Sequence, residues 1–386
     1  MALNETILEL LVRLHEENGS DLHITVGAKP AARVYGKIKR MEDLPVLTSE
    51  DTRGLAYSMV REEQRKRFEN EKELDFGYEQ EGLGRFRCNF YFQRGSVAMA
   101  IRALPLKIPT MEEILLPEVV RDKIFLPRGL ILVTGPTGSG KTTSLAAMIN
   151  KVNETVPEHI ITLEDPIEFS HSHQKCLINQ REIGEDSFSF GEAMRRVLRE
   201  DPDIIMVGEM RDLETMSASI TAAETGHLVF GTIHTINAPM SIERIIDVFP
   251  AEQQPMIRAQ LANALEVVMS QTLLQRSDRP GRLAAFEVML GVPAVRNLVR
   301  ENKIYQIHST MMTHGRIGMQ TMDQCLRDYY IAGLITLDTA LEKCHSPKEF
   351  RNLVSAREKE MEEGSDDRGS GSDTPEKGSS MGFVPQ

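Results

Sequence analysis

The sequence has little cysteine, no tryptophan and no long apolar run. Its four cysteines, Cys88, Cys176, Cys325 and Cys344, form no Cys-x-x-Cys pair, which disfavours a zinc site or a disulfide framework and predicts reduced, mostly buried thiols. Aromatic residues make up 5% of the chain and its formal net charge is −12, which argues against a basic, aromatic surface for nucleic acid.

No apolar stretch approaches the roughly 20 residues that a membrane-spanning helix needs. The first residues carry acids where a signal peptide would carry lysine or arginine. We therefore expect a cytoplasmic protein that binds no nucleic acid.

The N-terminal part of the chain, residues 1–104, is expected to fold as one α+β domain. Apolar residues at helical spacing predict an amphipathic helix over 3–17. Short apolar runs broken by glycine and proline predict strands and turns over 21–38. A helix rich in arginine and glutamate is expected over 50–70, and the clearest strand pattern covers 74–102.

The rest of the chain is predicted to contain a linker, a second domain and a tail. Four prolines mark residues 105–128 as the linker, with a short helix around 111–116. Residues 129–356 alternate short apolar strands with helical segments, which predicts an α/β domain with a parallel sheet. A helical run is expected from about 252 to 342. The acidic tail 357–386 has almost nothing to bury, so we predict that it is disordered.

A predicted β-hairpin within 84–102 carries two arginines on its polar face. If Phe92 faces Val97 across a four-residue loop, the register places Arg87 opposite Arg102. Like charges that lie opposite each other in a sheet repel. An anion bound between subunits would explain the pair, and solvated strand arginines are the alternative.

Residues 135–142 match the phosphate-binding P-loop pattern, between the apolar strand 130–133 and a helical stretch over 143–153. Backbone N–H groups of such a loop, together with the helix N-terminus, bind phosphate oxygens. Lys141 would reach the β- and γ-phosphates, and Thr142 would bind Mg²⁺. We therefore predict ATP and Mg²⁺ as cofactors, bound by Gly135, Pro136, Thr137, Gly138, Ser139, Gly140, Lys141, Thr142 and Thr143.

Two further predicted strands end in acidic residues. Glu164 and Glu168 follow the strand 160–163, and Glu209 follows the strand 204–207, which resembles a Walker B segment with Glu in place of Asp. Ligands usually bind at the carboxyl ends of strands in an α/β sheet. We favour Glu164 as the residue that activates water and Glu209 as a Mg²⁺ ligand, and the sequence leaves their assignment open.

Two histidines, His227 and His234, flank the predicted strand 228–233. Each could be a structural hydrogen-bonding residue or could lie at the nucleotide and sense the γ-phosphate. We place His234 among the catalytic candidates and His227 among the nucleotide-binding ones. No cysteine or second histidine lies at metal-ligand spacing, so a metal site here has no support.

Taken in order, these segments resemble the type II/type IV secretion ATPase superfamily. Its Walker A, Asp box, Walker B and His box match residues 135–143, 161–168, 201–212 and 225–235. Within the superfamily, the branch that retracts type IV pili is resembled by three segments, residues 20–23, 294–301 and 314–323. The second of these resembles the Ala-Ile-Arg motif of that branch, with Val295 in place of Ile.

The resemblance covers about residues 3–350 and implies a PAS-like N-terminal domain, a RecA-like P-loop ATPase domain with C-terminal helices and a ring of six subunits. Arg87 and Arg102 would complete the ATP site of a neighbouring subunit. ATP turnover would rotate the domains and, through a platform protein at the inner-membrane base of the pilus, withdraw pilin. The chain would be peripheral to the membrane, and a second retraction ATPase would be a further partner.

Other functions stay open. An accessory retraction motor would carry similar nucleotide motifs. An assembly or type II secretion ATPase commonly carries a tetracysteine insertion, which the chain lacks. A RecA-like nucleic-acid translocase is the alternative from another class, and a scaffold without turnover would have lost the acids that are present. Substitutions in 294–301 are expected to impair retraction more than ATP turnover.

Overall fold

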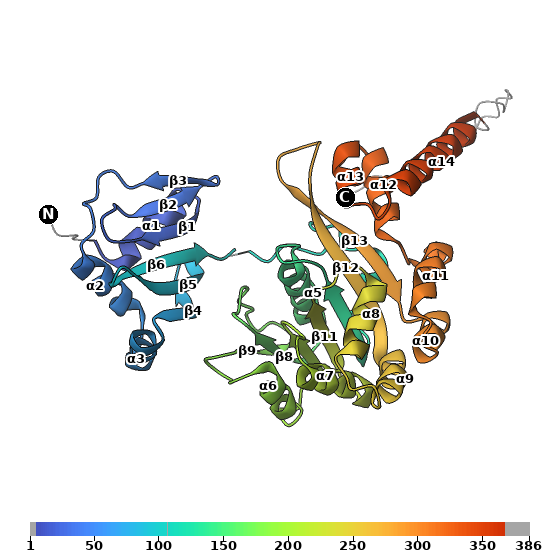
Figure 1. The fold of residues 1–386 in the computed structure, drawn as a ribbon, viewed down its shortest axis with the longest axis horizontal. Helices are drawn as coiled ribbons and strands as arrows, with labels where there is room; N and C mark the ends of the chain where they lie inside the picture. The colour runs from blue at the N-terminus through green and yellow to red at the C-terminus, as the bar shows by residue number, and fades with distance from the viewer. Residues whose placement is uncertain (1–4, 106, 367–386) are drawn as a thin grey trace, which may run out of the picture.

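The computed structural model describes residues 5–105 and 107–366, and only the backbone of residues 357–366. The chain forms two lobes joined by the segment that follows strand β6 (Figure 1). Each lobe is built on its own β-sheet, one of six strands and one of seven.

The N-terminal lobe is an antiparallel sheet in the order β3-β2-β1-β6-β5-β4, with three helices packed against it. Helix α1 begins at a capping box formed by Thr6 and Glu9, and it buries the apolar stripe that the sequence predicts. The elements are α1 (Ile7–Glu16), β1 (Gly19–Ile24), β2 (Ala31–Val34), β3 (Lys37–Arg40), α2 (Ser49–Met59), α3 (Glu62–Glu71), β4 (Glu73–Gln80), β5 (Gly84–Gln93) and β6 (Ser96–Ala103).

The single helix predicted over 50–70 is wrong, because two helices occupy this range. Helix α2 ends at Met59 and α3 begins at Glu62. Between them Val60 and Arg61 take an extended backbone, and Val60 packs on the lobe's hydrophobic core. Val60 is partly buried there, and Arg61 is the N-cap from which the separate helix α3 begins.

The predicted pairing of β5 with β6 is confirmed: Phe92 faces Val97, and Arg87 faces Arg102. The connection is shorter than expected because Gln93 also pairs with Ser96. The two turn residues between them have φ of 49° and 76°, the left-handed backbone of a two-residue hairpin turn.

The second lobe is built on a sheet in the order β13-β12-β7-β11-β10-β8-β9, parallel except for the antiparallel β13. This confirms the α/β class. The elements up to the last strand are α4 (Glu118–Lys123), β7 (Gly129–Thr134), α5 (Lys141–Thr155), β8 (His159–Glu164), β9 (Leu177–Glu182), α6 (Phe190–Val197), β10 (Ile204–Val207), α7 (Leu213–Thr225), β11 (Leu228–Ile233), α8 (Ala238–Asp247), α9 (Gln254–Ala264), β12 (Leu265–Gln275) and β13 (Arg282–Leu290).

The helical run predicted from about 252 to 342 is wrong in its middle. The long strands β12 and β13 lie there, and β12 pairs with β7, the strand that precedes the P-loop. Both strands are buried almost throughout. A strand buried on both faces shows no alternation of apolar and polar residues, so periodicity does not separate it from a buried helix.

The predicted linker belongs largely to the second lobe. Met111, Leu116, Val120 and Ile124 are buried in that lobe's hydrophobic core. The helix in this segment is α4, which begins at Glu118, instead of the one expected around 111–116.

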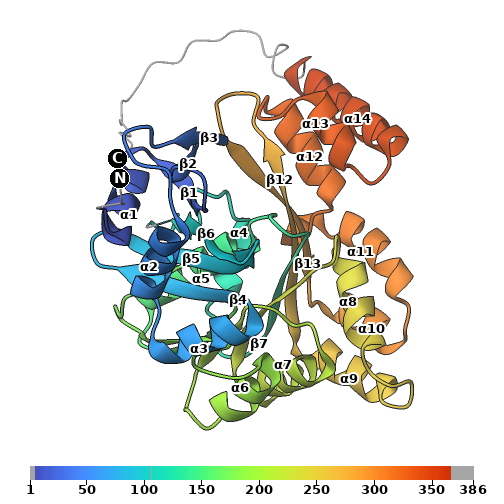
Figure 2. The same ribbon diagram turned by 60° about the vertical axis from the view of Figure 1, so that its left-hand side comes forward.

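The helices that follow β13 lie along the β12–β13 hairpin, with α10 and α11 beside it and α12, α13 and α14 near its turn (Figure 2). The last three have a small core of their own with that hairpin. The elements are α10 (Pro293–Arg300), the 3₁₀ turn Ile304–Gln306, α11 (Ile307–Thr313), the 3₁₀ turn Gly315–Ile317, α12 (Met322–Ile331), α13 (Leu337–Lys343) and α14 (Pro347–Asp366).

Helix α14 corrects the expected start of the disordered tail, because it continues to Asp366. The remainder of the predicted tail, 367–386, lies outside the described residues. Across the ranges that the structure describes, no helix is long and apolar enough to cross a membrane. All four cysteines are free and three are buried, as expected.

Candidate nucleotide-binding site

The P-loop connects the end of β7 to the start of α5 and has the backbone that phosphate binding requires. Gly135, Gly138 and Gly140 have φ of 145°, 77° and 89°, which side chains disfavour. A Cβ on Gly135 would lie 2.3 Å from the carbonyl oxygen of Gln271 and 2.6 Å from Ser139 Oγ. The Ser139 hydroxyl is buried without a hydrogen-bond partner. A phosphate oxygen would satisfy it, so the loop fits a nucleotide phosphate.

Lys141, the first residue of α5, is folded against the loop and is only 8% exposed. Its Nζ donates to the carbonyl oxygens of Gly135 at 2.8 Å and Pro136 at 3.2 Å. Burial lowers the pKa of Lys141, and the nearby charges of Glu209 and Glu168 act in the opposite direction. The ammonium group is thus held beside the backbone that would bind phosphate.

His234 connects this lysine to the Walker B acid. Its Nδ1 lies 3.5 Å from Lys141 Nζ, and its Nε2 lies 3.2 Å from Glu209 Oε1. Arg211 also donates to both oxygens of Glu209. Burial opposes ionisation of Glu209, but the Arg211 hydrogen bonds and His234 outweigh it, so the pKa of Glu209 is lowered. The structure therefore brings three of the predicted catalytic residues together.

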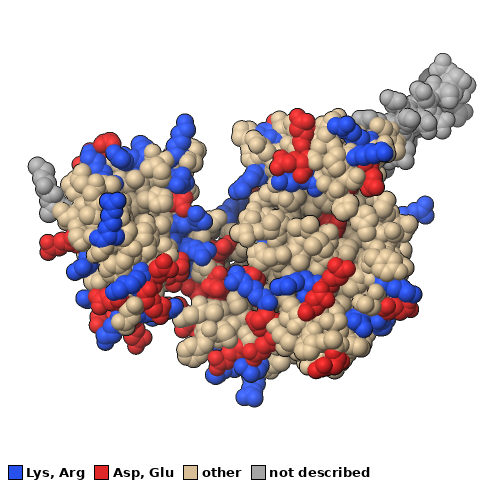
Figure 3. Space-filling model, in the orientation of Figure 1, with Lys and Arg blue, Asp and Glu red and all other residues tan. Residues whose placement is uncertain are grey.

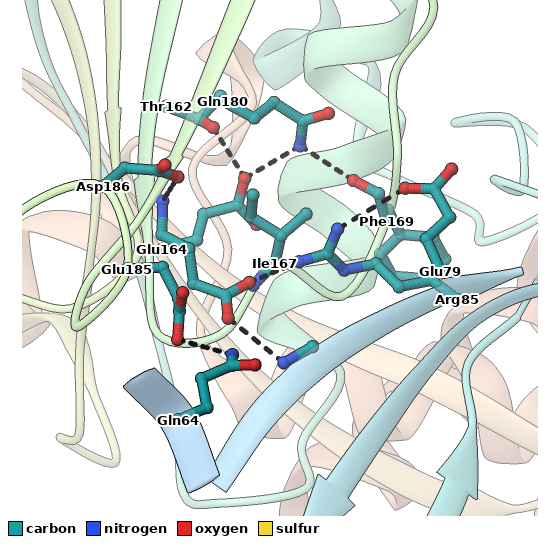
Figure 4. Close-up of polar contacts among 12 residues, drawn as sticks. Gln64, Glu79, Arg85, Thr162, Glu164, Ile167, Phe169, Gln180, Glu185 and Asp186 are labelled. Atoms are coloured by element: carbon teal, nitrogen blue, oxygen red, sulfur yellow. Dashed lines mark hydrogen bonds and ion pairs between the residues drawn. The ribbon is translucent and has the colours of Figure 1, made fainter. Parts of the chain in front are cut away.

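Glu164 lies at the end of β8 and is 4% exposed. Its Oε1 accepts hydrogen bonds from Thr162 Oγ1 at 2.6 Å and Gln180 Nε2 at 3.0 Å (Figure 4). Burial raises its pKa, and these two bonds act against that rise. A Cβ on Gly208, which directly precedes Glu209, would lie 3.3 Å from Glu164 Cα. The two predicted acids therefore follow strand ends that touch.

Mg²⁺ would find few protein ligands here. In the described part of the chain, no group of three or more His, Cys, Asp or Glu residues could hold a metal ion. Mg²⁺ is commonly bound by one or two protein groups together with substrate phosphates. The half-buried Thr142 and the ionised Glu209 fit that pattern. Glu168 is half-buried, and its charge acts to raise the pKa of Lys141.

A pocket of about 390 Å³ opens beside the P-loop, between the start of α5 and the β12–β13 hairpin. Gln271 of β12 joins the two, because its Nε2 donates to the Ser139 carbonyl oxygen at 2.8 Å and its Oε1 accepts from Ser144 Oγ at 2.8 Å. No local pattern identifies Gln271, because the residues of β12 fall within the range predicted as helical. Among the lining residues are three arginines, Arg276, Arg279 and Arg282.

The structure contradicts the placement of His227 at the nucleotide. His227 precedes β11, so it lies at the edge of the parallel sheet opposite the P-loop. Its Nδ1 lies 3.1 Å from the Ala222 carbonyl oxygen, and it lines a pocket with Glu158 and Asp203. Within one subunit, the described contacts of His227 therefore lie away from the P-loop.

The two predicted arginines of the N-terminal lobe differ in their surroundings. Arg87 is exposed, lines a cleft between the lobes and has no hydrogen-bond or ion-pair partner among the described residues. Arg102 is 65% exposed and its Nε donates to Asp21 Oδ1 at 2.8 Å. The structure gives neither arginine a contact with the P-loop within the described chain.

A third arginine, which the sequence analysis did not single out, joins the two lobes. Arg85 of β5 donates to the carboxylate of Glu182 at the end of β9 (Figure 4). Glu182 also accepts from the backbone N–H groups of Gly77 at 3.3 Å and Ile167 at 3.1 Å. Figure 3 shows acidic and basic side chains gathered where the lobes face each other. No local sequence signal identified Glu182, because β9 was not predicted.

Comparisons with known proteins show the family to which the chain belongs. The model of the family described as type II/IV secretion system protein matches residues 110–364. The chain is 49% identical over 344 residues to the type IV pilus retraction ATPase PilT of Pseudomonas aeruginosa, covering 89% of this chain and 99% of that protein. It is also 40% identical over 350 residues to the type IV pilus ATPase PilU of Pseudomonas aeruginosa, covering 91% of each.

A solved structure is also similar across most of the chain. The pilus retraction motor PilT with bound ADP superposes with a TM-score of 0.85 at 49% sequence identity, covering 90% of this chain and 99% of that one. The arrangement of a β-rich N-terminal lobe and an α/β lobe with a P-loop is thus shared with a nucleotide-binding protein.

Proposed function

The chain belongs to the type II/IV secretion system protein family, and on that premise we propose that it is an ATP-hydrolysing motor that retracts type IV pili and so drives twitching motility. The observation that carries the proposal is the match, over nearly the full length of both proteins, to a relative named for pilus retraction. The P-loop and its surrounding charged groups supply the chemistry that such a motor needs.

Each part of the site has a role in this proposal. The loop amides would hold the phosphates, and Lys141 would turn from the loop carbonyls toward the β- and γ-phosphates. Mg²⁺, bound by Thr142 and Glu209, would neutralise charge that develops on the phosphate oxygens. Glu164 would take a proton from the attacking water, and its raised pKa suits a general base. His234 would report loss of the γ-phosphate to Glu209.

The nucleoside would occupy the pocket beside the P-loop, where the β12–β13 arginines lie. We further propose that the N-terminal lobe is PAS-like, that the second lobe is RecA-like, and that six subunits form a ring. Arg87, which is exposed and has no ion-pair or hydrogen-bond partner among the described residues, and Arg102 would then reach the phosphates of a neighbouring subunit. The ring would act at the inner-membrane base of the pilus on a platform protein, with a second retraction ATPase as a further partner.

An accessory retraction motor is the second candidate, because the relative named PilU is also similar over nearly the whole chain. Deleting the gene and scoring surface pili and twitching separates a retraction motor from an assembly motor. A retraction motor leaves excess pili that do not retract, whereas an assembly motor leaves no pili. Wild-type twitching in the deletion strain would contradict the main proposal.

The enzymatic part of the proposal is tested with purified protein. We expect ATP hydrolysis that is lost in Lys141→Ala and Glu209→Gln and is unaffected by single-stranded DNA. Absence of hydrolysis in the unmodified protein would contradict a motor. Stimulation by DNA would instead favour a nucleic-acid translocase.

A further inference from the structure

The side-chain amide of Gln180 is held in one orientation by backbone groups. Gln180 lies on β9, and its Oε1 accepts from the N–H of His171 at 2.8 Å. Its Nε2 donates to the carbonyl oxygen of Phe169 at 2.8 Å and to Glu164 Oε1 at 3.0 Å (Figure 4). A backbone N–H can only donate and a carbonyl oxygen can only accept, so the NH₂ group must face Glu164.

Glu164 is consequently held asymmetrically. Its Oε1 accepts from both Gln180 and Thr162, while its Oε2 has no hydrogen-bond partner among the residues that the structure describes and is not fully buried. Both donors come from β-strands, Thr162 from β8 and Gln180 from the paired strand β9. Groups built on rigid strands hold a carboxylate in a fixed geometry.

We propose that Gln180 is a positioning residue for ATP hydrolysis: with Thr162, it saturates Oε1 of Glu164 and leaves Oε2 as the oxygen that accepts the proton of the attacking water. This inference rests on the proposed function of Glu164. As the water oxygen bonds to the γ-phosphorus, the bond to the β–γ bridging oxygen breaks and ADP leaves. Glu164 holds the water proton until phosphate or solvent takes it.

The same amide secures the loop after β8. By bonding the backbone at Phe169 and His171, it fixes the segment that carries Glu168 against β9. The orientation of Glu164 and the position of the loop therefore depend on one side chain. A purely structural role would concern the loop alone, and the experiment has to separate the two roles.

Several charged groups surround Glu164 and contribute to its titration. Arg85 of β5 favours its ionised form, and Glu168 of the following loop disfavours it. Glu182 is opposite Glu164 in the β8–β9 pairing, and Glu209 follows the other neighbouring strand, β10. The substitutions described next leave these four charged residues unchanged. A shift in the titration of Glu164 therefore reports the lost hydrogen bond.

The test is the pH profile of kcat for ATP hydrolysis in Gln180→Leu and Thr162→Val. Each variant loses one donor to the ionised carboxylate, so its acidic limb should move to higher pH by about one unit. At a pH on that limb, kcat should fall about tenfold. Thr162→Ser keeps a hydroxyl donor and should retain the original limb.

Gln174→Leu is the matched control, because Gln174 precedes β9 and its side chain bonds Asn150 instead of Glu164. A uniform loss of kcat at every pH in Gln180→Leu and Thr162→Val, with the limb unmoved, would overturn the inference. So would a wild-type profile in Glu164→Gln, since Glu164 would then not be the base.

A second readout separates this inference from the proposed function. The infrared band of the protonated Glu164 carboxyl, identified by its absence in Glu164→Gln, titrates without turnover. Its midpoint should rise in Gln180→Leu and Thr162→Val, and an unchanged midpoint would overturn the inference. If the unmodified protein hydrolyses no ATP, the motor proposal fails, and the infrared titration still decides whether Gln180 and Thr162 hold the carboxylate.

Discussion

Replacing Arg85 by methionine should weaken the contact between the two lobes, because it removes a buried ion pair. The Arg85 side chain is 17% exposed and the Glu182 side chain 7% exposed. Methionine keeps much of the apolar stem but removes the guanidinium. Glu182 would then remain at the end of β9 with two backbone N–H donors and no cation within the contact.

Breaking a buried ion pair by removing one partner costs about 3–5 kcal/mol. Glu182 keeps the N–H groups of Ile167 and Gly77, which continue to stabilise the carboxylate. We therefore expect a loss of about 2–3 kcal/mol, at or just below the lower limit of that range. Adding Glu182→Gln to Arg85→Met removes the orphaned charge and should restore most of the loss.

The measurement is urea unfolding of the single and double variants, together with hydrogen exchange of β4 and β5, which carry the N-terminal side of the contact. Arg67→Met is the control, since Arg67 pairs with Glu71 on the surface of α3 with both side chains about half exposed. That change should stay within about 0.5 kcal/mol. Equal stability of Arg85→Met and Arg67→Met, or a double variant less stable than Arg85→Met, would refute the reasoning.

Three further outcomes are expected. Burial lowers the pKa of His171 to about 4, whereas the unfolded chain binds this proton near pH 6.5. The free energy of unfolding in urea should therefore fall by up to about 3 kcal/mol as the pH drops from about 6.5 to about 4. His171→Gln should lose this pH dependence. Arg87→Ala should lower ATP turnover without changing the unfolding midpoint. Arg102→Ala should lower turnover and also reduce the free energy of unfolding by up to about 1 kcal/mol, because it removes the hydrogen bond to Asp21. Unchanged turnover in both variants would contradict a role for these arginines in the ATP site of a neighbouring subunit. Arg296→Ala should reduce the free energy of unfolding by about 2–3 kcal/mol in the same assay, because the Arg296 guanidinium donates to backbone carbonyl oxygens at the end of α9 and to a carboxylate. An unchanged midpoint would mean that residues 294–301 act only as a surface and do not stabilise the fold.

Local patterns were sufficient for the parts of the site that are contiguous in the chain. The strand β10 has the bounds that its apolar run predicts, and the P-loop lies between a strand and a helix as its motif requires. The pairing of Arg87 with Arg102 also followed from the sequence, because a short turn and period-two alternation fix the register of a hairpin.

Residues that act through distant pairing could not be found in this way. Gln271 and Gln180 lie on β12 and β9, two strands whose place in the sheet is set by contacts far apart in the sequence. His227 shows the opposite error: it lies near His234 in the sequence, yet the intervening strand β11 separates them. A strand of six residues spans about 20 Å, so only one of its flanking residues can meet the P-loop.

The pairing of β8 with β9 places the contact between the lobes beside Glu164, the carboxylate proposed to activate water. Glu164 and Glu182 are opposite each other at the ends of these strands, and the Arg85 charge that binds Glu182 also favours ionisation of Glu164. Moving the N-terminal lobe away would withdraw that charge, and the Glu164 pKa would rise further because burial would be less opposed. A lobe movement that opens this contact would therefore lower the fraction of Glu164 that is ionised and able to accept a proton, and one that closes it would raise that fraction. Lobe position would in this way affect the ionisation of Glu164 through one arginine, without a change in the P-loop itself.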